Sequence, residues 1–451
     1  MLSIIILVAL VAAIVFATAK LKINPFLALL ASAVVGGFAF GLPIDTIAPT
    51  ITTAFGATLG SIGLIILFGT IIGVILERTG AAISMADALI RVLGTRFPTL
   101  TTSVIGFIVS IPVFCDSGFV ILNSLKKAIA AKTKVSLVAM TIALMTGLYA
   151  THTFVPPTPG PLAAAGNLGA IDSLGLIIGF GLIAATVSAG AALLWANRFL
   201  KKDVMLPDEQ TEDLGQEYEE MRAGYGKLPN GFMAFLPILT PLVLICLASV
   251  ARLPVRPFGE DGVYAAVVFL GTPVIALAAG LIASLFLLRG TGKLEVFGER
   301  VSEGIRISAP ILLITGSGAA FGAILAASPL TDFLGGALSS LGLGLAVPFL
   351  ISAALKTAQG SSTVAMVTSS VLTLPLLPAL GLDSEMGRVL SVLAIGAGAM
   401  VVSHANDSFF WVVSQLSRIP VATAYRTLTP ATAIQGVAGF GAVWVMGLIV
   451  L

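Results

Sequence analysis

The chain has 451 residues, of which 57% are hydrophobic and only 10% are charged, and its mean hydropathy is +1.06. Because roughly a quarter of the residues of soluble domains are charged, this composition excludes a soluble globular protein and indicates an all-α membrane protein with many spans. The formal net charge of +2 gives no reason to expect nucleic acid as a partner.

Cysteine and histidine are too sparse for a metal centre. Cys115 and Cys246 lie in apolar surroundings and form no disulfide framework or ligand pattern. His152 and His404 are the two histidines of the chain, too few for a multi-histidine site. We therefore expect neither a metal nor a cofactor.

The chain begins with three apolar runs long enough to cross a hydrocarbon core of ~30 Å: 2–19, 26–42 and 54–76. The first run lacks the basic region and cleavage site of a signal peptide, so we expect a retained helix. Segment 81–93 has its charges on one side, as in an interfacial helix. Basic residues lie after the first run and around this segment, at Lys20, Lys22, Arg78, Arg91 and Arg96. The positive-inside rule places them in the cytoplasm and the N-terminus outside.

Two interrupted segments follow. Segment 98–131 is apolar but broken at 112–118, and it is too short for two full spans, so a helical hairpin that dips into the membrane fits better. Segment 135–171 is a helix broken at 151–161, where four prolines cannot continue the helical hydrogen bonds. Irregular backbone at membrane depth is tolerated only where it is buried in protein or lines a cavity. A further span, 174–200, closes this half.

Residues 201–230 form the long hydrophilic segment, with eight acidic and four basic residues. Basic residues flank the preceding span, so we interpret this segment as a cytoplasmic linker.

The second half repeats this order. Spans are expected at 232–250, 263–288, 307–327 and 432–451. A second hairpin, about 347–378, is interrupted at 356–362, and a second broken helix, about 389–418, is interrupted at 403–408. Thr151-His152 corresponds to Ser403-His404. By the charge rule, 54–76 runs inward and its counterpart 307–327 runs outward, so residues 1–200 and 231–451 are predicted to be inverted-topology repeats, as in secondary transporters.

Residues with capping chemistry precede each resumed helix: Asp116 and Ser117; Thr158 with Pro161; Ser361 and Ser362; Asn406, Asp407 and Ser408. Helix N-termini expose unpaired N–H groups and the positive end of the helix dipole. If the four meet near the midplane, they form an anion site, and the expected ligand is a small carboxylate.

The candidate substrate-binding residues all lie in or beside the four breaks: Asp116, Ser117, His152, Thr153, Pro157, Gly160, Gln359, Gly360, Ser361, Ser362, His404 and Asn406. Asp116, Asp407 and His152 are candidates for proton coupling, and Lys356 for an electrostatic role toward the anion. Each has an ordinary alternative, since carboxylates cap helices and lone histidines are often structural. Lys126 and Lys127 are interpreted as solvated ends of the first hairpin.

Four stretches in these breaks also carry a family resemblance. Segments 111–120 (IPVFCDSGFV), 152–165 (HTFVPPTPGPLAAA), 358–366 (AQGSSTVAM) and 403–408 (SHANDS) resemble the signature stretches of the gluconate:proton symporter (GntP) family. The resemblance implies an inner-membrane, proton-coupled importer of sugar acids such as gluconate, with relatives that take glycerate, fructuronate or D-serine. It also implies kinship with the ion-transporter superfamily, whose members resemble homodimeric elevators.

Departures from the pattern of gluconate carriers at Cys115, Ser117 and Thr158 leave a smaller hydroxy acid open. We expect a transporter and no enzymatic activity. A sodium-coupled symporter is the nearest alternative, because carbonyls and serines at helix breaks also suit Na⁺. An anion channel and an intramembrane hydrolase are more distant alternatives. The chain has no His-Glu-x-x-His motif for a metalloprotease.

Overall fold

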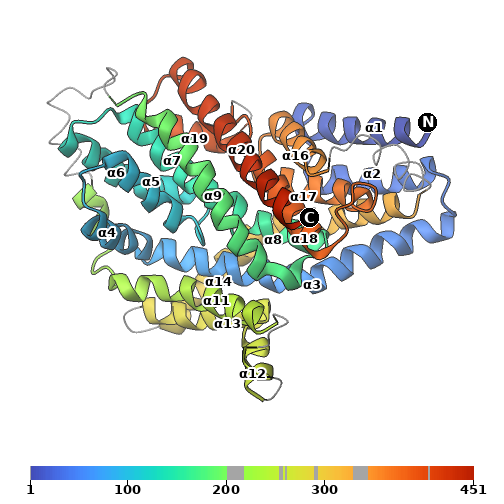
Figure 1. Cartoon of the computed structure of the whole chain (residues 1–451), viewed down its shortest axis with the longest axis horizontal. Helices are drawn as coiled ribbons and strands as arrows, with labels where there is room; N and C mark the ends of the chain where they lie inside the picture. The colour runs from blue at the N-terminus through green and yellow to red at the C-terminus, as the bar shows by residue number, and fades with distance from the viewer. Residues whose placement is uncertain are drawn as a thin grey trace.

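The computed structural model describes residues 2–200, 218–252, 257–259, 262–288, 293–328, 344–404 and 407–451. Within these ranges all regular elements are helices, which confirms the predicted all-α class (Figure 1). Six helical stretches are long and apolar enough to cross a membrane, and a bent pair of helices brings the number to seven if it counts as one span. The described chain is therefore built as a multi-pass membrane protein.

The first half runs through nine α-helices: α1 (Leu2–Val15), α2 (Pro25–Ala39), α3 (Ile44–Arg78), α4 (Ala81–Leu93), α5 (Pro98–Val109), α6 (Cys115–Thr133), α7 (Leu137–Phe154), α8 (Pro159–Asn167) and α9 (Leu174–Asn197). A π-helical stretch (Phe16–Lys20) continues α1, and a 3-10 turn (Ile171–Ser173) precedes α9. The first break lies between Val109 and Cys115, so the predicted interruption at 112–118 overlaps the start of α6. The second lies between Phe154 and Pro159, so the last two of the four prolines belong to the first turn of α8.

The described second half has the helices α11 (Gly231–Ala251), α12 (Gly262–Leu270), α13 (Pro273–Ser284), α14 (Lys293–Ala326), α16 (Ala346–Gln359), α17 (Ser362–Thr373), α18 (Glu385–Gly398), α19 (Ser408–Leu416) and α20 (Val421–Val450). Short 3-10 turns follow α13 (Leu285–Leu287) and α17 (Leu374–Leu376). The order of a helix pair, an interrupted helix and a long helix thus occurs in both halves.

Several predicted spans differ from the helices. The run 263–288 is not straight, since α12 and α13 meet at an angle of 68°, where Pro273 begins a new helix and cannot donate a hydrogen bond to the preceding turn. Spans predicted to start at 54, 307 and 432 start earlier, at Ile44, Lys293 and Val421. The added first turns of these helices contain polar side chains, which lower the local hydropathy below that expected of a membrane span. Helix α2 has only 15 residues, which is about 22 Å and shorter than a full crossing.

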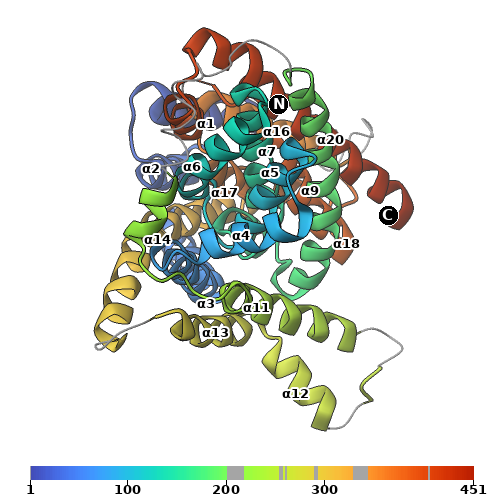
Figure 2. The ribbon, with the colours of Figure 1, turned by 90° about the vertical axis from the view of Figure 1, so that its left-hand side faces the viewer.

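Small residues allow the long helices to approach closely. In α14, Gly304 faces Ile71 and Gly316 faces the ring of Phe55, both of α3. Helix α14 also packs against α2 and α17. In Figures 1 and 2, α11, α12 and α13 lie on one side of α3. The helix pairs α5–α6 and α16–α17 and the interrupted helices α7–α8 and α18–α19 lie on the other side. This layered packing positions the helix breaks inside the protein.

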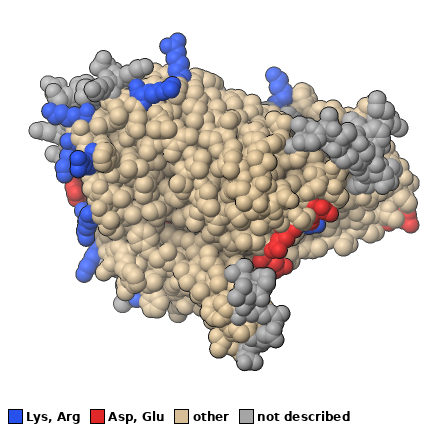
Figure 3. All heavy atoms as spheres, viewed as in Figure 1, with Lys and Arg blue, Asp and Glu red and all other residues tan. Residues whose placement is uncertain are grey.

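Much of the molecular surface is uncharged. Most of the face in Figure 3 is free of charge apart from a group of Asp and Glu side chains at its lower right, and lysine and arginine gather at the end where α4 and α6 lie. Large apolar side chains remain exposed on the outer helices, among them Val243, Ile282, Leu194 and Trp444. An uncharged, apolar outer surface is typical of helices that face lipid.

The contact between α5 and α7 gives a stability prediction. A Cβ atom on Gly147 would collide with the backbone of Ser103, whereas one on Gly190 would meet no atom within 4 Å. Both glycines lie inside helices, so alanine offers each the same gain in helix propensity. We expect Gly147→Ala to destabilise the protein by about 1–3 kcal/mol, and Gly190→Ala to leave the thermal midpoint in detergent unchanged or raised. Equal midpoints for the two variants would contradict this packing.

Candidate functional site

A buried ion pair joins the two interrupted regions of the second half. Lys356, in the last turn of α16, places its Nζ 2.6 Å from Oδ2 of Asp407, which precedes α19. The side chains are 0% and 5% exposed. Lys356 also donates a hydrogen bond to the carbonyl of Gly360, in the turn between α16 and α17. The α16–α17 turn and the break before α19 are therefore held together by one lysine.

The carboxylate of Asp407 uses both oxygens. Its Oδ1 accepts a hydrogen bond from the N–H of Phe409 at 3.0 Å and so caps the N-terminus of α19. Its Oδ2 accepts from Lys356 and from the hydroxyl of Ser403. The prediction that Asp407 caps a resumed helix is confirmed, and the ion pair with Lys356 is a feature that sequence reasoning missed.

Two threonines of helix α20 form hydrogen bonds with the backbone of Ser403. The N–H of Ser403 donates to Oγ1 of Thr432 at 3.0 Å, and the hydroxyl of Thr429 donates to the Ser403 carbonyl at 2.7 Å. Next to it, Nε2 of His404 lies 2.9 Å from the carbonyl of Thr357 in α16. The irregular backbone before α19 therefore has polar partners on α16 and α20, as backbone at membrane depth requires.

The turn between α16 and α17 contains a glycine with a positive φ and a serine that caps α17. Gly360 has φ of +95°, a conformation that side chains disfavour. Ser361 is the N-cap of α17, and its hydroxyl accepts from the N–H of Val364 at 3.3 Å. The predicted capping role of Ser361 is confirmed. Gln359 ends α16, but its side chain lies outside the described residues, as does the whole of Asn406.

In the corresponding turn of the first half, between α5 and α6, one carboxylate oxygen has no hydrogen-bond partner among the described residues. Asp116 lies in the first turn of α6, whose N-cap is Phe114 and has no side-chain cap. In the described structure Oδ1 of Asp116 is buried without a hydrogen-bond partner, and Oδ2 is 3.8 Å from Sγ of Cys115. The expected capping role of Asp116 and Ser117 is wrong, and Ser117 interacts with Glu77 of α3 instead.

His152 lies beside this turn. It lies in the last turn of α7, is 4% exposed, and its ring centroid is 6.0 Å from that of Phe114. Its Nδ1 is buried without a partner in the described residues. Asp116 and His152 are each close enough to Lys356 and Asp407 to interact with both charges. The fold thus gathers four ionisable side chains from both halves of the chain.

The proline-rich break turns back on the end of α7. The hydroxyl of Thr158 donates to the carbonyls of His152 and Val155, at 2.9 and 2.8 Å, so it closes the turn and makes no cap for α8. The peptide bond between Pro156 and Pro157 is cis.

The side chains around this break are committed to packing. The Pro157 carbonyl contacts Gly69 of α3, and Gly160 in α8 faces Met366 of α17. The hydroxyl of Thr153 bonds to carbonyls within α7. The start of α8 therefore lies beside the start of α17, whereas Pro157 faces α3.

Tyr149 is a site residue that sequence reasoning missed. Its hydroxyl donates to the carbonyl of Ala399 at 3.1 Å, and Lys356 Nζ lies 5.8 Å from its ring centroid. It also interacts with Ser362 at the start of α17. Tyr149 precedes His152 by three residues and so lies on the same face of α7, a spacing that could have revealed it.

The interpretation of Lys126 and Lys127 as solvated is wrong. Their relative exposures are 1% and 6%, because the end of α19 and helix α7 cover this part of α6. The Nζ of Lys126 donates to Thr141 Oγ1 at 3.0 Å and to Ser417 Oγ at 2.7 Å, and it lies 5.0 Å from the ring centroid of Phe119. Lys126 thus ties α6 to the segment after α19.

Taken together, the arrangement suits an anion that carries hydroxyl groups. The N-termini of α8 and α17 lie beside each other, and the Lys356 cation is close to both halves of the site. Asp116 and His152 add groups that can accept or donate a proton. Ser361, Ser362 and Tyr149 supply hydroxyls within the same region.

Comparisons with known proteins identify the family of the chain. The sequence pattern of the GntP family permeases matches residues 1–449. An uncharacterized permease of Haemophilus influenzae is 34% identical, covering 95% of this chain and 89% of that protein. A gluconate permease of Pseudomonas aeruginosa is 30% identical (95% and 94%). The D-serine transporter DsdX of Escherichia coli is 32% identical (97% and 96%).

A solved structure supports the fold. The YdaH transporter of Alcanivorax borkumensis, whose crystal structure is described as revealing an unusual topology, superposes with a TM-score of 0.65 at 15% identity, covering 95% of this chain and 99% of that one. At this identity the likeness concerns the fold alone. The family match and the relatives over nearly the whole length lead to one conclusion: this chain belongs to the GntP permease family.

Proposed function

We propose that the chain is a secondary active transporter that imports a small hydroxylated monocarboxylate, gluconate or a smaller glycerate-like acid, together with a proton. The observation that carries this proposal is the buried group of Asp116, His152, Lys356 and Asp407 beside the N-termini of two helices. Relatives named as gluconate permeases and a D-serine transporter support the substrate class.

The substrate carboxylate would bind where α8 and α17 begin. Gly160 lets α8 approach α17 closely, and N–H groups at helix starts favour an anion. Lys356 supplies the positive charge, and Ser361 and Ser362 supply hydrogen bonds. The hydroxyl groups of the substrate would meet Asp116 and the two histidines, with Thr153 and Pro157 shaping the wall from behind.

Asp116 is the best candidate for the proton carrier. A proton on Asp407 would remove the negative charge that pairs with Lys356 and would weaken the hydrogen bonds from Ser403 and the Phe409 N–H. Asp116 has a buried Oδ1 without a partner in the described residues. Protonation of Asp116 would remove one negative charge from the loaded site before it crosses the membrane, and His152 would relay the proton.

The transport cycle we propose uses inverted repeats. Residues 1–200 and 231–451 would form the two repeats, with α5–α6 and α16–α17 as re-entrant hairpins and a cytoplasmic linker at 201–230. The site would move across the inner membrane as an elevator in each subunit of a homodimer, with the N-terminus outside. The repeated element order and the fold likeness to the YdaH transporter support this scheme.

The driving ion can be tested in proteoliposomes. With a sodium-free pH gradient, acid on the substrate-entry side, we expect accumulation of labelled gluconate or glycerate, since one pH unit is worth about 1.4 kcal/mol, or about tenfold. A protonophore should abolish it, and counterflow exchange should saturate, unlike flux through a channel. Accumulation that requires sodium and ignores the pH gradient would replace proton coupling with the sodium alternative.

Asp116→Asn separates coupling from binding. The amide mimics the protonated carboxyl, so we expect the variant to lose accumulation under a pH gradient but to keep exchange of labelled for unlabelled substrate. Asp45→Asn, at an exposed position near the start of α3, should behave as wild type. Normal gradient-driven accumulation by Asp116→Asn would remove Asp116 from the coupling mechanism.

The contribution of the Lys356–Asp407 ion pair to stability can be measured with a double-mutant cycle. Lys356→Met leaves Asp407 buried and unpaired, which should cost about 3–5 kcal/mol. Asp407→Asn keeps the cap on Phe409 but leaves the lysine unpaired. The double variant should be more stable than the sum of the single effects predicts, as measured by thermal unfolding in detergent. Additive effects would show that the two charges do not stabilise each other. Lys132→Met, at an exposed position in α6, is the matched control.

A further inference from the structure

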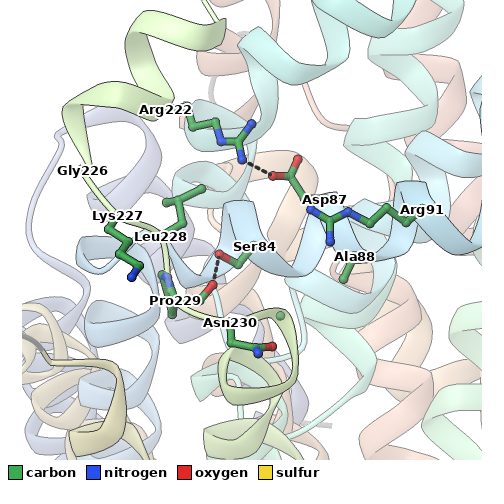
Figure 4. Close-up of a pocket in the computed structure, with 11 residues that line it drawn as sticks. Ser84, Asp87, Ala88, Arg91, Arg222, Gly226, Lys227, Leu228, Pro229 and Asn230 are labelled. Carbon is green, nitrogen blue, oxygen red and sulfur yellow. Dashed lines mark hydrogen bonds and ion pairs between the residues drawn. The ribbon is translucent and has the colours of Figure 1, made fainter.

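A separate cavity of about 580 Å³ lies where α4, residues 218–230 and the start of α11 meet. Figure 4 shows its lining, in which Asp87 and Arg91 come from α4, and Arg222, Lys227 and Asn230 from the other side. Its size falls within the range of about 300–1,000 Å³ typical of small-molecule sites. None of the proposed transport residues lines it.

The cavity has an excess of positive charge. Three basic residues and one acidic residue line it, a formal excess of two. The Asp87 carboxylate is already engaged, because it accepts a hydrogen bond from the Tyr218 hydroxyl at 2.8 Å and lies 3.7 Å from Arg222. Arg91, one turn further along α4, is exposed and makes no ion pair with an acid in the described part of the chain.

The walls of the cavity are held by specific contacts. The hydroxyl of Ser84 in α4 donates to the Pro229 carbonyl at 2.9 Å. Tyr218 is buried against α4, and burial together with the hydrogen bond to Asp87 raises its pKa well above the usual range, so it stays a neutral donor. The segment that forms one side of the cavity is thereby fixed to α4 before any ligand binds.

The start of α11 adds to the positive field. Asn230 is its N-cap and accepts from the Phe232 N–H at 2.9 Å. The first turn of α11 contains no acidic residue, so the positive end of the helix dipole remains uncompensated there. Two guanidinium groups and this helix start converge on one hollow, a combination that suits phosphate oxygens.

We propose that this cavity is a binding site for a phosphate-bearing anion, with Arg91 as its main ligand and Arg222 shared between the ligand and the carboxylates of Asp87 and Glu219. A phosphate monoester carries about −1.5 to −2 at pH 7, which matches the excess charge of the lining better than a single carboxylate does. The phosphate could belong to a soluble molecule or to the headgroup of a lipid, since Val92, Leu93 and Phe97 expose apolar surface next to Arg91.

Occupancy of this site would strengthen a contact between two parts of the chain. Helix α4 packs against α11 and also against α5, the first helix of the proposed hairpin. A ligand held by Arg91 on one side and by Arg222 and the start of α11 on the other would bridge α4 to the helix that follows the linker.

The test is the thermal midpoint of the purified full chain in detergent, titrated with inorganic phosphate at constant ionic strength set with chloride. We expect the midpoint to rise with phosphate and Arg91→Gln to weaken the apparent affinity at least about tenfold. Because Arg91 is exposed on the surface of α4, the variant should fold normally. Arg96→Gln, at an exposed position outside the cavity, is the matched control and should respond as wild type.

A second arm distinguishes the source of the phosphate. In nanodiscs of neutral lipid with or without phosphatidic acid, a lipid site predicts a midpoint that rises with phosphatidic acid in wild type but not in Arg91→Gln, with no response to inorganic phosphate. A response to inorganic phosphate that needs Arg91 identifies a soluble ligand. Responses that are absent from both arms, or that Arg91→Gln retains in full, would overturn the site. Asp116→Asn should keep the response, because the two sites share no residue.

Discussion

The arrangement of the candidate site depends on one buried ion pair, between Lys356 and Asp407. Two charges removed from water carry a desolvation cost that their mutual attraction repays only when the geometry is good and the remaining valences are satisfied. Here Lys356 also bonds to Gly360, and Asp407 also accepts from Ser403 and the start of α19. The pair is thus less a source of net stability than a device that fixes the α16–α17 turn relative to the break before α19.

The same requirement explains the hydroxyl groups around the breaks. An irregular backbone inside a membrane protein must find partners for its N–H and C=O groups. The Ser403 backbone finds them in Thr429 and Thr432 of α20, and the carbonyls of His152 and Val155 find one in Thr158. These threonines therefore supply the hydrogen-bond partners that the backbone of the two breaks needs.

Sequence reasoning located the breaks because clusters of prolines or polar residues interrupt the apolar sequence there, whereas single prolines such as Pro237 lie inside a continuous helix. It could not pair Lys356 with Asp407, because residues 51 apart meet only through the packing of α16 against α18. It placed Lys126 in solvent for the same reason, since the cover comes from Thr141 and from Ser417, which is 291 residues away. Local chemistry predicts where a helix stops, whereas the partner of a buried charge is decided by tertiary packing.

The two interrupted helices differ in how their breaks are held, and this difference bears on where the proton is carried. The break after α7 packs on α3 through Pro157 and Gly69, and on α17 through Gly160, and its polar side chain, Thr158, bonds to local carbonyls. The break before α19 is held by Asp407 and Ser403. A proton that binds Asp407 would disturb the contacts that hold that break, whereas a proton on Asp116 would disturb no hydrogen bond of Oδ1 in the described structure. In the proposed cycle, coupling through Asp116 would therefore let the charge of the site change while both helix breaks keep their shape.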